Sequence, residues 1–278
     1  MSKLNVKSYI VKLILYFFLI LLAFVTVFPF FYMFIAATKN WHQIAFHADQ
    51  ILPRRDWVDN LKNNYFMLIG SAPFLKCVWN SIYISIMGTI LTLLSSSLCG
   101  YAFAVYEFRG KEFFFWIIMF SLMIPPTVGV IPLFSIMKTL GWFSKARALY
   151  LPMLANAYGV FLIRKFLEES FPKDLLDAAR IDGCSEFKLY CKVALPVMLP
   201  SLGALAIITF TTLWGAYFLP LLFMREPSSW TIPLMLTKVP PPSAALGGVI
   251  TMFPYVLFFV IFSKWIIKGI VEGSVREV

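Results

Sequence analysis

The side chains that most often perform catalysis or bind metals are scarce in this sequence. Its only histidines, His42 and His47, stand five residues apart in a polar connection that also holds Asp49. Imidazole and carboxylate groups could ligate a metal ion there, but we interpret both histidines as solvated side chains. No histidine remains elsewhere to act as a catalytic base.

The cysteines also lack a recognisable chemical pattern. Cys77, Cys99, Cys184 and Cys191 are too few for a disulfide scaffold, and no two have the C-x-x-C spacing of a zinc or redox site. We therefore interpret them as free thiols and predict no metal site.

Ionisable residues avoid the interior of every long apolar stretch in the sequence. A proton-coupled transporter usually needs an ionisable relay in the membrane, and an intramembrane hydrolase needs an acid, a base or a metal. The pattern argues against both classes. It predicts a chain with no catalytic chemistry of its own, and we expect no cofactor bound to it.

The composition is that of a membrane protein. Hydrophobic residues make up 60% of the 278 residues and charged residues 14%, whereas soluble domains average roughly 45–50% and about 25%. The net charge of +10 comes from Lys and Arg at the edges of apolar blocks. Because these cations do not form a stripe interleaved with stacking aromatics, we expect them to flank a membrane and not to bind nucleic acid.

Long uncharged stretches define the expected elements, because a helix needs about 20 apolar residues to cross the hydrocarbon. They predict an all-α polytopic membrane protein with six transmembrane helices in a single domain, 1–278. The expected spans are about 13–37, 77–105, 113–137, 146–165, 199–224 and 245–267. The first far exceeds a signal-peptide core and is expected to remain as an anchor. The last two are expected to begin after their prolines.

An even number of spans places both termini on one side. With six spans, 14 of the 24 Lys and Arg residues lie in the termini and in the connections on the same side as the termini. Since cytoplasmic connections carry the excess of positive charge, the count predicts cytoplasmic termini, although the difference is small.

The connection 166–192 contains residues that typically begin and end a short surface helix. Pro172 suits a first helical turn, Asp174 complements the helix dipole, and Gly183 can take the left-handed conformation just past a helix end. One face combines a bulky apolar residue with small ones, at Leu175, Ala178, Ala179 and Asp182. The pattern fits an amphipathic helix lying on the bilayer as well as a helix that docks on a partner.

Asp177-Ala178-Ala179, with Gly183 following after three further residues, resembles the EAA loop of ABC-importer permeases, in which a cytoplasmic coupling helix docks on the ATP-binding subunit. The order of further motifs is similar to the carbohydrate-uptake permeases of the maltose-type, MalG-like family. These motifs are Gly100-Tyr101-Ala102-Phe103-Ala104, Phe108-Arg109-Gly110-Lys111, Pro125-Pro126, Ile131-Pro132-Leu133, Leu195-Pro196 and Thr209-Phe210 with Trp214.

The resemblance implies the type I ABC-importer permease fold and several partners. These are a homologous second permease subunit, two copies of a cytoplasmic ATPase that uses ATP and magnesium, an extracytoplasmic solute-binding protein, and membrane lipid. It also implies the plasma membrane of a bacterium or archaeon. The implied coupling residues are Asp174, Leu175, Asp177, Ala178, Ala179, Asp182 and Gly183.

Three positions depart from the family pattern. Asp177 stands where Glu is usual, Cys184 replaces an alanine, and Trp214-Gly215-Ala216 replaces a Trp-Asn-Asp motif. The shorter Asp side chain would need a small shift in docking. Loss of the Asn and Asp removes polar groups that could have lined the pathway.

Five residues in or beside the expected spans could contact a neutral sugar, which proteins bind with hydrogen bonds and aromatic faces. They are Asn156, Tyr158, Thr209, Trp214 and Tyr217. The alternative is that the polar groups form hydrogen bonds between helices, each worth roughly 1 kcal/mol or less, and that Trp214 packs between helices. Prolines of the third span could likewise form a gate or a static bend.

The sequence thus favours a permease subunit that forms half of a carbohydrate pathway and couples it to an ATPase. The alternatives are an ABC permease for glycerol phosphate, an amino acid or a peptide, and an ATP-independent secondary transporter or channel.

Overall fold

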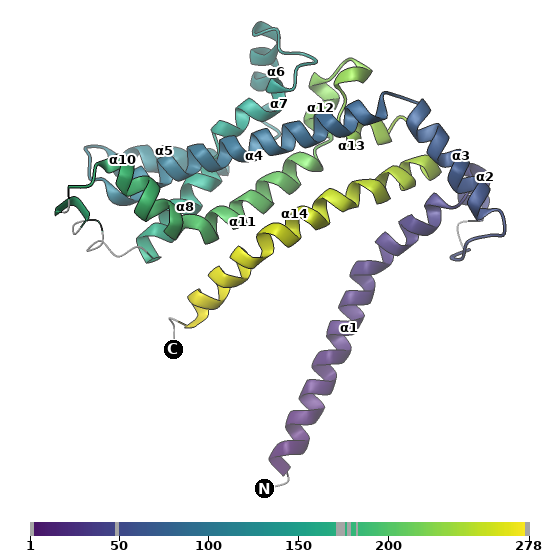
Figure 1. Ribbon diagram of the computed structural model, residues 1–278, viewed down its shortest axis with the longest axis horizontal. Coiled ribbons are helices and arrows are strands. Elements are labelled where there is room, and N and C mark those ends of the chain that lie inside the picture. Colours follow the sequence, from purple (N-terminus) through teal and green to yellow (C-terminus); the bar gives the residue numbers. More distant parts are fainter. Residues whose placement is uncertain (1–2, 48–49, 171–175, 177–178, 182, 276–278) are drawn as a thin grey trace. The chain divides into compact units, whose positions relative to one another are not determined.

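The structure, a computed structural model, describes residues 3–47, 50–170, 176, 179–181 and 183–275 (Figure 1). The predicted all-α class is confirmed, and no strand occurs in these ranges. The elements are α1 (Lys3–Ala37), α2 (Trp41–Phe46), α3 (Trp57–Gly70), α4 (Phe74–Val105), α5 (Lys111–Met123), α6 (Val130–Thr139), α7 (Arg147–Tyr150), η1 (Leu151–Leu154), α8 (Ala157–Ser170), α10 (Glu186–Leu189), η2 (Tyr190–Ala194), α11 (Leu195–Trp214), α12 (Phe218–Phe223), η3 (Pro227–Ser229), α13 (Ile232–Leu236) and α14 (Pro241–Val275).

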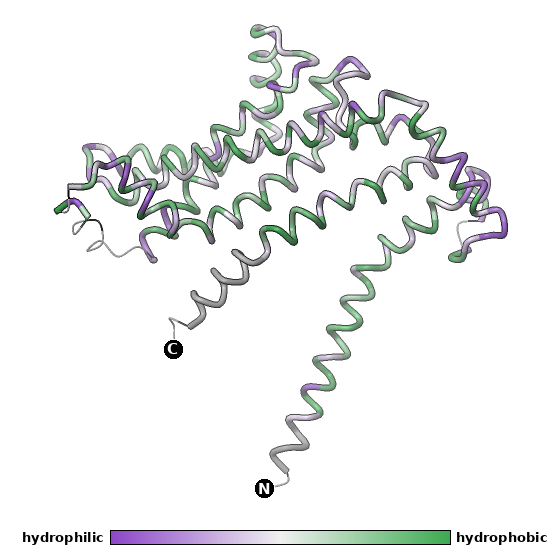
Figure 2. Tube along the Cα trace, in the orientation of Figure 1, coloured by the Kyte–Doolittle hydropathy of each residue, from purple (hydrophilic) through white to green (hydrophobic). Residues whose placement is uncertain are grey.

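Within the described ranges, 4 helical stretches are long and apolar enough to cross a membrane: Ser8–Ala37, Phe74–Val105, Glu186–Trp214 and Pro241–Ser263. Apolar residues dominate these stretches, and hydrophilic residues concentrate in the connections (Figure 2). They correspond to the first, second, fifth and sixth expected spans. The total of six spans stays a prediction.

The third expected span is not one continuous helix. It consists of α5, with 13 residues, and α6, with 10, separated at Ile124–Gly129. Ile124 is extended, with φ −78° and ψ 120°, because a residue before proline is disfavoured in the α conformation. Pro132 lies in the first turn of α6, where its missing N–H would have had no partner inside the helix.

The fourth expected span is also interrupted. A short α7 runs into the 3-10 turn η1, and α8 begins only at Ala157. The Asn156 side chain accepts a hydrogen bond of 2.7 Å from the backbone N–H of Gly159, as a helix N-cap does. Helix α8 then continues to Ser170, five residues beyond the predicted end at 165.

The helix that contains the fifth expected span begins before its prolines, and the start of the span itself stays a prediction. Helical structure runs without a break from Glu186 to Trp214, through the π-turn η2. The Leu195 N–H bonds to the carbonyl of Tyr190, five residues back. This wider turn precedes Pro196 and Pro200, which have no N–H to donate. The helix therefore continues through both prolines instead of starting after them.

The helices that contain the last two expected spans also have bounds that differ from 199–224 and 245–267. The fifth helix stops at Trp214, and α12 follows separately, so no helix covers the predicted 199–224. Helix α14 begins at Pro241, before the predicted 245, because proline is accepted in a first helical turn.

The chain forms two compact units, Met1–Ala72 with Leu236–Met252, and Pro73–Met235 with Phe253–Val278. In the first unit, the side-chain amide of Asn64 donates to the carbonyls of Ala37 and Lys39 at 2.9 and 2.8 Å, which satisfies the end of α1. None of the most apolar stretch of α1 is buried. The single permease domain expected over 1–278 stays a prediction.

The second unit is built around α4, against which α8 and α11 pack. Close approach of α4 and α8 depends on Gly100, because a Cβ atom there would lie 2.7 Å from Cβ of Ile163. Small residues allow membrane helices to approach in this way, and van der Waals contact then holds them together.

Candidate functional site

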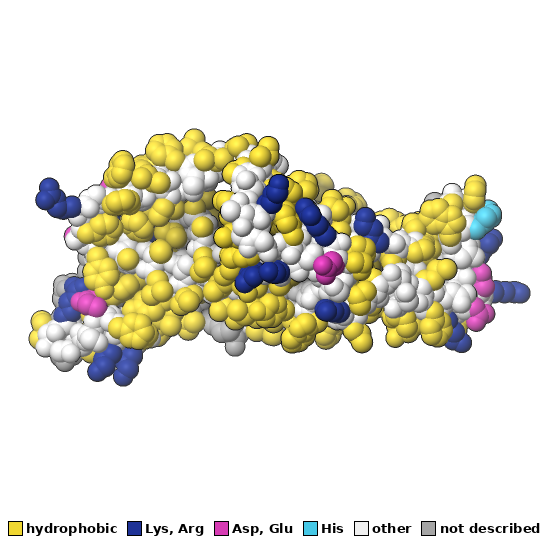
Figure 3. Space-filling view, turned by 90° about the horizontal axis from the view of Figure 1, so that it is seen from above, with side chains coloured by type: hydrophobic (Ala, Val, Ile, Leu, Met, Phe, Trp, Pro, Cys, Tyr) yellow, Lys and Arg dark blue, Asp and Glu magenta, His cyan; other side chains and the backbone are white. Residues whose placement is uncertain are grey.

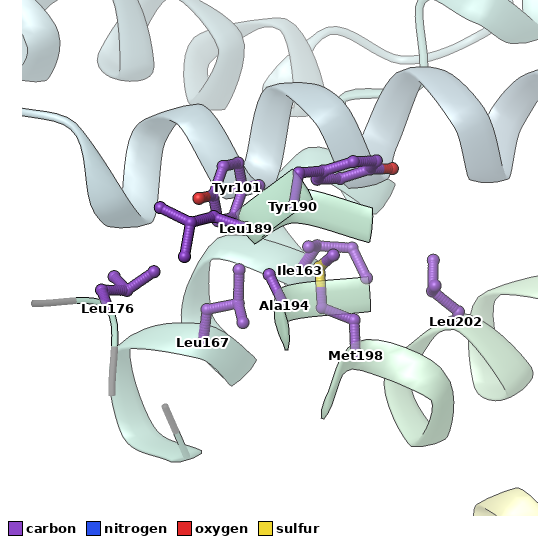
Figure 4. Packing of buried hydrophobic residues seen from close by; sticks show 9 residues of the cluster. All are labelled: Tyr101, Ile163, Leu167, Leu176, Leu189, Tyr190, Ala194, Met198 and Leu202. Atoms are coloured by element: carbon purple, nitrogen blue, oxygen red, sulfur yellow. The ribbon is translucent and has the colours of Figure 1, made fainter. Parts of the chain in front are cut away.

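A buried cluster fixes the connection that follows α8 to the rest of the second unit. It joins α4, α8, the connection, α10, η2 and α11 through nine apolar side chains (Figure 4): Tyr101, Ile163, Leu167, Leu176, Leu189, Tyr190, Ala194, Met198 and Leu202. Ala179 and Cys184 are partly buried and pack against it. The described parts of the connection are therefore attached to three long helices, and we call these nine residues the anchor cluster.

Five predicted coupling residues, Asp174, Leu175, Asp177, Ala178 and Asp182, lie outside the described residues. The other two, Ala179 and Gly183, are described. Their role in coupling stays a prediction.

The prediction that Gly183 ends a helix in the left-handed conformation is confirmed, because its φ is 77°. The Cys184 N–H bonds to the carbonyl of Ala179 at 3.1 Å, and the Gly183 N–H bonds to that of Arg180 at 3.0 Å. These two bonds form a Schellman motif, which satisfies the last carbonyls of a helix. Ser185 then precedes α10.

Two bulky side chains beside this turn project outward, and the sequence reading missed both. Ile181 is 86% exposed and Phe187 is 72% exposed. The inward side of the connection is taken by Leu176 and Leu189, which are buried in the anchor cluster. Ordinary apolar spacing gave no signal that Ile181 and Phe187 would be left outside.

Ion pairs also hold the connection. Glu186 accepts a hydrogen bond of 3.0 Å from Nε of Arg180 and one of 2.8 Å from the Tyr106 hydroxyl. Burial raises the pKa of Tyr106, and the bond to the Glu186 carboxylate raises it further. The hydroxyl therefore remains a donor, and it links the residue after α4 to the start of α10.

A second group of charges joins α5 to α8. Arg164 is buried, with 10% of its side chain exposed, and pairs at 2.7 Å with both Glu112 and Glu168. Its guanidinium also lies 3.8 Å from the ring centroid of Phe115. A cavity of about 600 Å³ opens beside it and is lined among the described residues by charges of both signs, including Glu107, Lys111, Glu112, Arg164, Glu168 and Arg180.

The five pathway candidates occupy different environments. Asn156 caps α8, Tyr158 and Tyr217 are exposed, and Thr209 and Trp214 are buried. The Thr209 hydroxyl has no hydrogen-bond partner within the described part of the chain. The structure does not gather the five into one site, and their contact with solute stays a prediction.

Trp214 belongs to an aromatic group that sequence reading did not find. Its ring stacks on Phe210, with centroids 5.8 Å apart, and meets Tyr255 edge-on at 6.3 Å. Phe210 in turn stacks on Phe258 at 3.9 Å. Aromatic residues at positions 255 and 258 were visible in the sequence, but their contact with α11 depends on packing over long sequence separation.

The histidine and cysteine side chains show no convergent arrangement. The rings of His42 and His47 lie 6.0 Å apart. Across the described residues no group of three His, Cys, Asp or Glu side chains is placed to hold a metal ion. The four cysteines are free thiols.

Comparison with known proteins gives concordant matches. Residues 96–272 match the family model described as binding-protein-dependent transport system inner membrane component. The arabinooligosaccharides transport system permease protein AraQ of Halalkalibacterium halodurans is 34% identical over 92% of this chain and 93% of that protein. The lactose transport system permease protein LacG of Rhizobium radiobacter is 30% identical, over 92% and 93%.

A solved structure is also similar. It is the crystal structure of a bacterial ABC transporter involved in the import of the acidic polysaccharide alginate, with a TM-score of 0.75 and 22% identity, covering 96% of this chain and 99% of that one. At this identity the likeness concerns the fold.

Proposed function

Because the chain belongs to the family of binding-protein-dependent transport system inner membrane components, we propose that it forms half of the pathway through which an ATP-driven importer carries a carbohydrate across the plasma membrane of a bacterium or archaeon. The family consists of multi-pass transport permeases and not of enzymes. The observation that carries the proposal is the match over residues 96–272, which spans both the anchor cluster and the aromatic group of α11 and α14.

The solute class follows from the relatives. Those named for arabinooligosaccharides and lactose are 34% and 30% identical, and a permease of Brucella abortus named for sn-glycerol 3-phosphate is 28% identical. These identities support a carbohydrate over glycerol phosphate. Tyr158 and Tyr217 are exposed aromatic residues that could offer rings and hydroxyls to a sugar, and we propose them, with Asn156 and Thr209, as pathway residues.

Coupling to an ATPase is proposed for the connection 166–192. Support comes from its anchoring to three long helices and from the exposed Ile181 and Phe187, which give a partner an apolar surface to cover. A helix pushed at this point would move with α8 and α11 because the anchor cluster joins them. ATP and magnesium would be used on the ATPase, of which we propose two copies, on the cytoplasmic side with both termini.

The remaining proposed partners are a homologous second permease, lipid and an extracytoplasmic solute-binding protein. The unburied apolar length of α1 supports the first two, because such a surface needs lipid or another apolar helix around it.

Reconstitution tests the function. The tagged chain, purified with its partner subunits and placed in proteoliposomes, should hydrolyse ATP faster when a binding protein loaded with one carbohydrate is added, and should accumulate that carbohydrate. Glycerol 3-phosphate should have no effect. Solute flux that continues without ATP, or purification with no ATPase subunit, would contradict the proposal.

A further inference from the structure

Four basic side chains gather where α6 ends, α7 begins and α12 ends. Lys138 lies in the last turn of α6, Lys145 lies in the connection before α7, Arg147 is the first residue of α7, and Arg225 follows α12; all four are exposed. Figure 3 shows a group of Lys and Arg side chains near the middle of one face, with an acidic group among them. We call Lys138, Lys145, Arg147 and Arg225 the basic platform.

The backbone beneath the platform is held in place. Ser144 has φ 57°, which is unfavourable for a residue other than glycine. Its hydroxyl accepts hydrogen bonds from the N–H groups of Arg225 and Glu226 at 3.1 and 3.3 Å, and its own N–H bonds to the Phe223 carbonyl at 2.8 Å. These bonds join two connections that are far apart in sequence.

Aromatic rings fix the two guanidinium groups. Arg225 lies over Phe143, 4.1 Å from the ring centroid, and Arg147 lies over Trp142 at 5.2 Å. A ring attracts the cation through its quadrupole but leaves its positive charge uncompensated. The arginines are therefore ordered before any partner arrives, which reduces the entropy lost on binding.

The platform differs in charge balance from the other end of the same unit. Beside the anchor cluster, Lys111, Arg164, Lys165 and Arg180 each pair with a glutamate at 2.7 to 3.0 Å. No platform cation forms an ion pair with any acid in the ranges that the structure describes. Its charge is thus available to an external anion.

The platform and the anchor cluster lie toward opposite ends of α4. The apolar cluster under the platform includes Ile84 of α4, whereas the anchor cluster includes Tyr101 of the same helix. At about 1.5 Å per residue they are about 25 Å apart along the axis, close to the roughly 30 Å of the hydrocarbon. If the anchor end faces the ATPase, the platform faces the opposite compartment.

We propose that the basic platform binds an acidic surface of the solute-binding protein; this rests on the proposed function. Positive charge is normally concentrated on the cytoplasmic side of membrane proteins, so four clustered cations on the other side need a reason of their own. An acidic partner would explain why these cations are clustered there. Opposite charges would speed encounter and fix the orientation in which the binding protein delivers its solute.

Anionic lipid headgroups are the rival partner. Cations that reach lipid phosphates do so by extending their flexible stems, whereas Arg147 and Arg225 lie over aromatic rings on two joined connections. Exposed Glu226, adjacent to Arg225, and the following Ser228 and Ser229 make the same surface hydrophilic. A hydrophilic surface of this kind suits a hydrated protein contact.

The test measures ATP hydrolysis by the reconstituted complex as the solute-loaded binding protein is titrated. In the doubly substituted Lys145→Glu, Arg225→Glu chain, the half-saturating concentration of binding protein should rise on the order of tenfold at low salt, as expected for loss of steering charges. Basal and maximal rates should stay the same. The difference should shrink at about 1 M salt, where the Debye length is about 3 Å.

A matched control carries Arg54→Glu and Lys62→Glu, the same charge change at exposed positions before and within α3, and should bind as wild type does. Arg225→Lys should also bind normally, which separates charge from folding. An equal effect in the control, or none in the platform variant, would overturn the proposal.

The lipid rival is tested in nanodiscs with and without phosphatidylglycerol. If the platform substitutions act only where that lipid is present, and leave binding-protein titration unchanged in its absence, lipid is the partner and the proposal fails. A wild-type complex that no loaded binding protein stimulates would refute the proposed function itself, and the platform proposal with it.

Discussion

Trp214 is 2% exposed and lies between Phe210 of α11 and Tyr255 of α14. Removing a buried aromatic side chain from a packed interior costs about 3–5 kcal/mol in soluble proteins. Such burial favours packing over direct contact with solute. The same residue is a pathway candidate, so the two roles need separate measurements.

For Trp214→Ala we expect transport, ATP hydrolysis and the yield of assembled complex to fall together, because a cavity weakens the whole α11–α14 contact. The measurement is the ratio of transport to ATP hydrolysis in complexes matched for assembly. A packing role leaves this ratio unchanged. A selective fall in transport would instead place the indole ring in the solute pathway.

Gly183 offers a cleaner residue-scale test, because nothing lies within 4 Å of where its Cβ would be. Any penalty for Gly183→Ala must therefore come from its φ of 77°, at about 1–2 kcal/mol. We expect hydrogen exchange in the connection to rise by roughly five- to thirtyfold, as such a free-energy loss implies. Gly70→Ala is the control, since that site also has open space and lacks a positive φ; equal effects would refute the conformational explanation.

Ile181, with 86% of its surface exposed, is the side chain that we expect an ATPase to cover. Ile181→Asp should abolish solute-stimulated ATP hydrolysis while membrane insertion is retained, because a carboxylate would be buried without a partner. Ile181→Met keeps the size and polarity and should keep the activity. Normal stimulation of the Asp variant would show that no partner covers this position.

The elements could be predicted from the sequence only where hydropathy alone decides them. Long uncharged stretches identified the helices later seen as α1, α4, α11 and α14. Hydropathy does not register backbone hydrogen bonding, so it merged α5 with α6 across Ile124–Gly129 and missed the cap at Asn156. The left-handed conformation of Gly183 could be predicted from the local sequence. The exposure of Ile181 could not, because it depends on how the anchor cluster packs.

Arg164 connects elements, and its neighbour Lys165 provides the comparison. Arg164 is buried between Glu112 of α5 and Glu168 of α8, while the Lys165–Glu169 pair is exposed on both sides. Exposed pairs contribute about 0–1 kcal/mol, whereas removing one partner of a buried pair is far more destabilising.

We therefore expect Arg164→Gln to lower the unfolding temperature of the purified complex and to speed hydrogen exchange in α5. Lys165→Gln should change neither. Similar behaviour of the two single variants would mean that the α5–α8 contact does not depend on this ion pair.

At the scale of the whole molecule, the orientation in the membrane connects the proposals, because the proposed ATPase and binding protein would meet opposite ends of the second unit. Lys188, in α10, lies beside the anchor cluster, and Lys145 lies in the basic platform; both are exposed.

In a chain whose four native cysteines are replaced, we introduce Lys188→Cys or Lys145→Cys. A membrane-impermeant thiol reagent added to intact cells should label the variant at position 145 and miss the variant at 188. Both should react once the membrane is opened, which controls for accessibility. Labelling of position 188 from outside would reverse the orientation, and it would then place the basic platform in the cytoplasm, where the excess of positive charge is ordinary and no acidic binding protein is present.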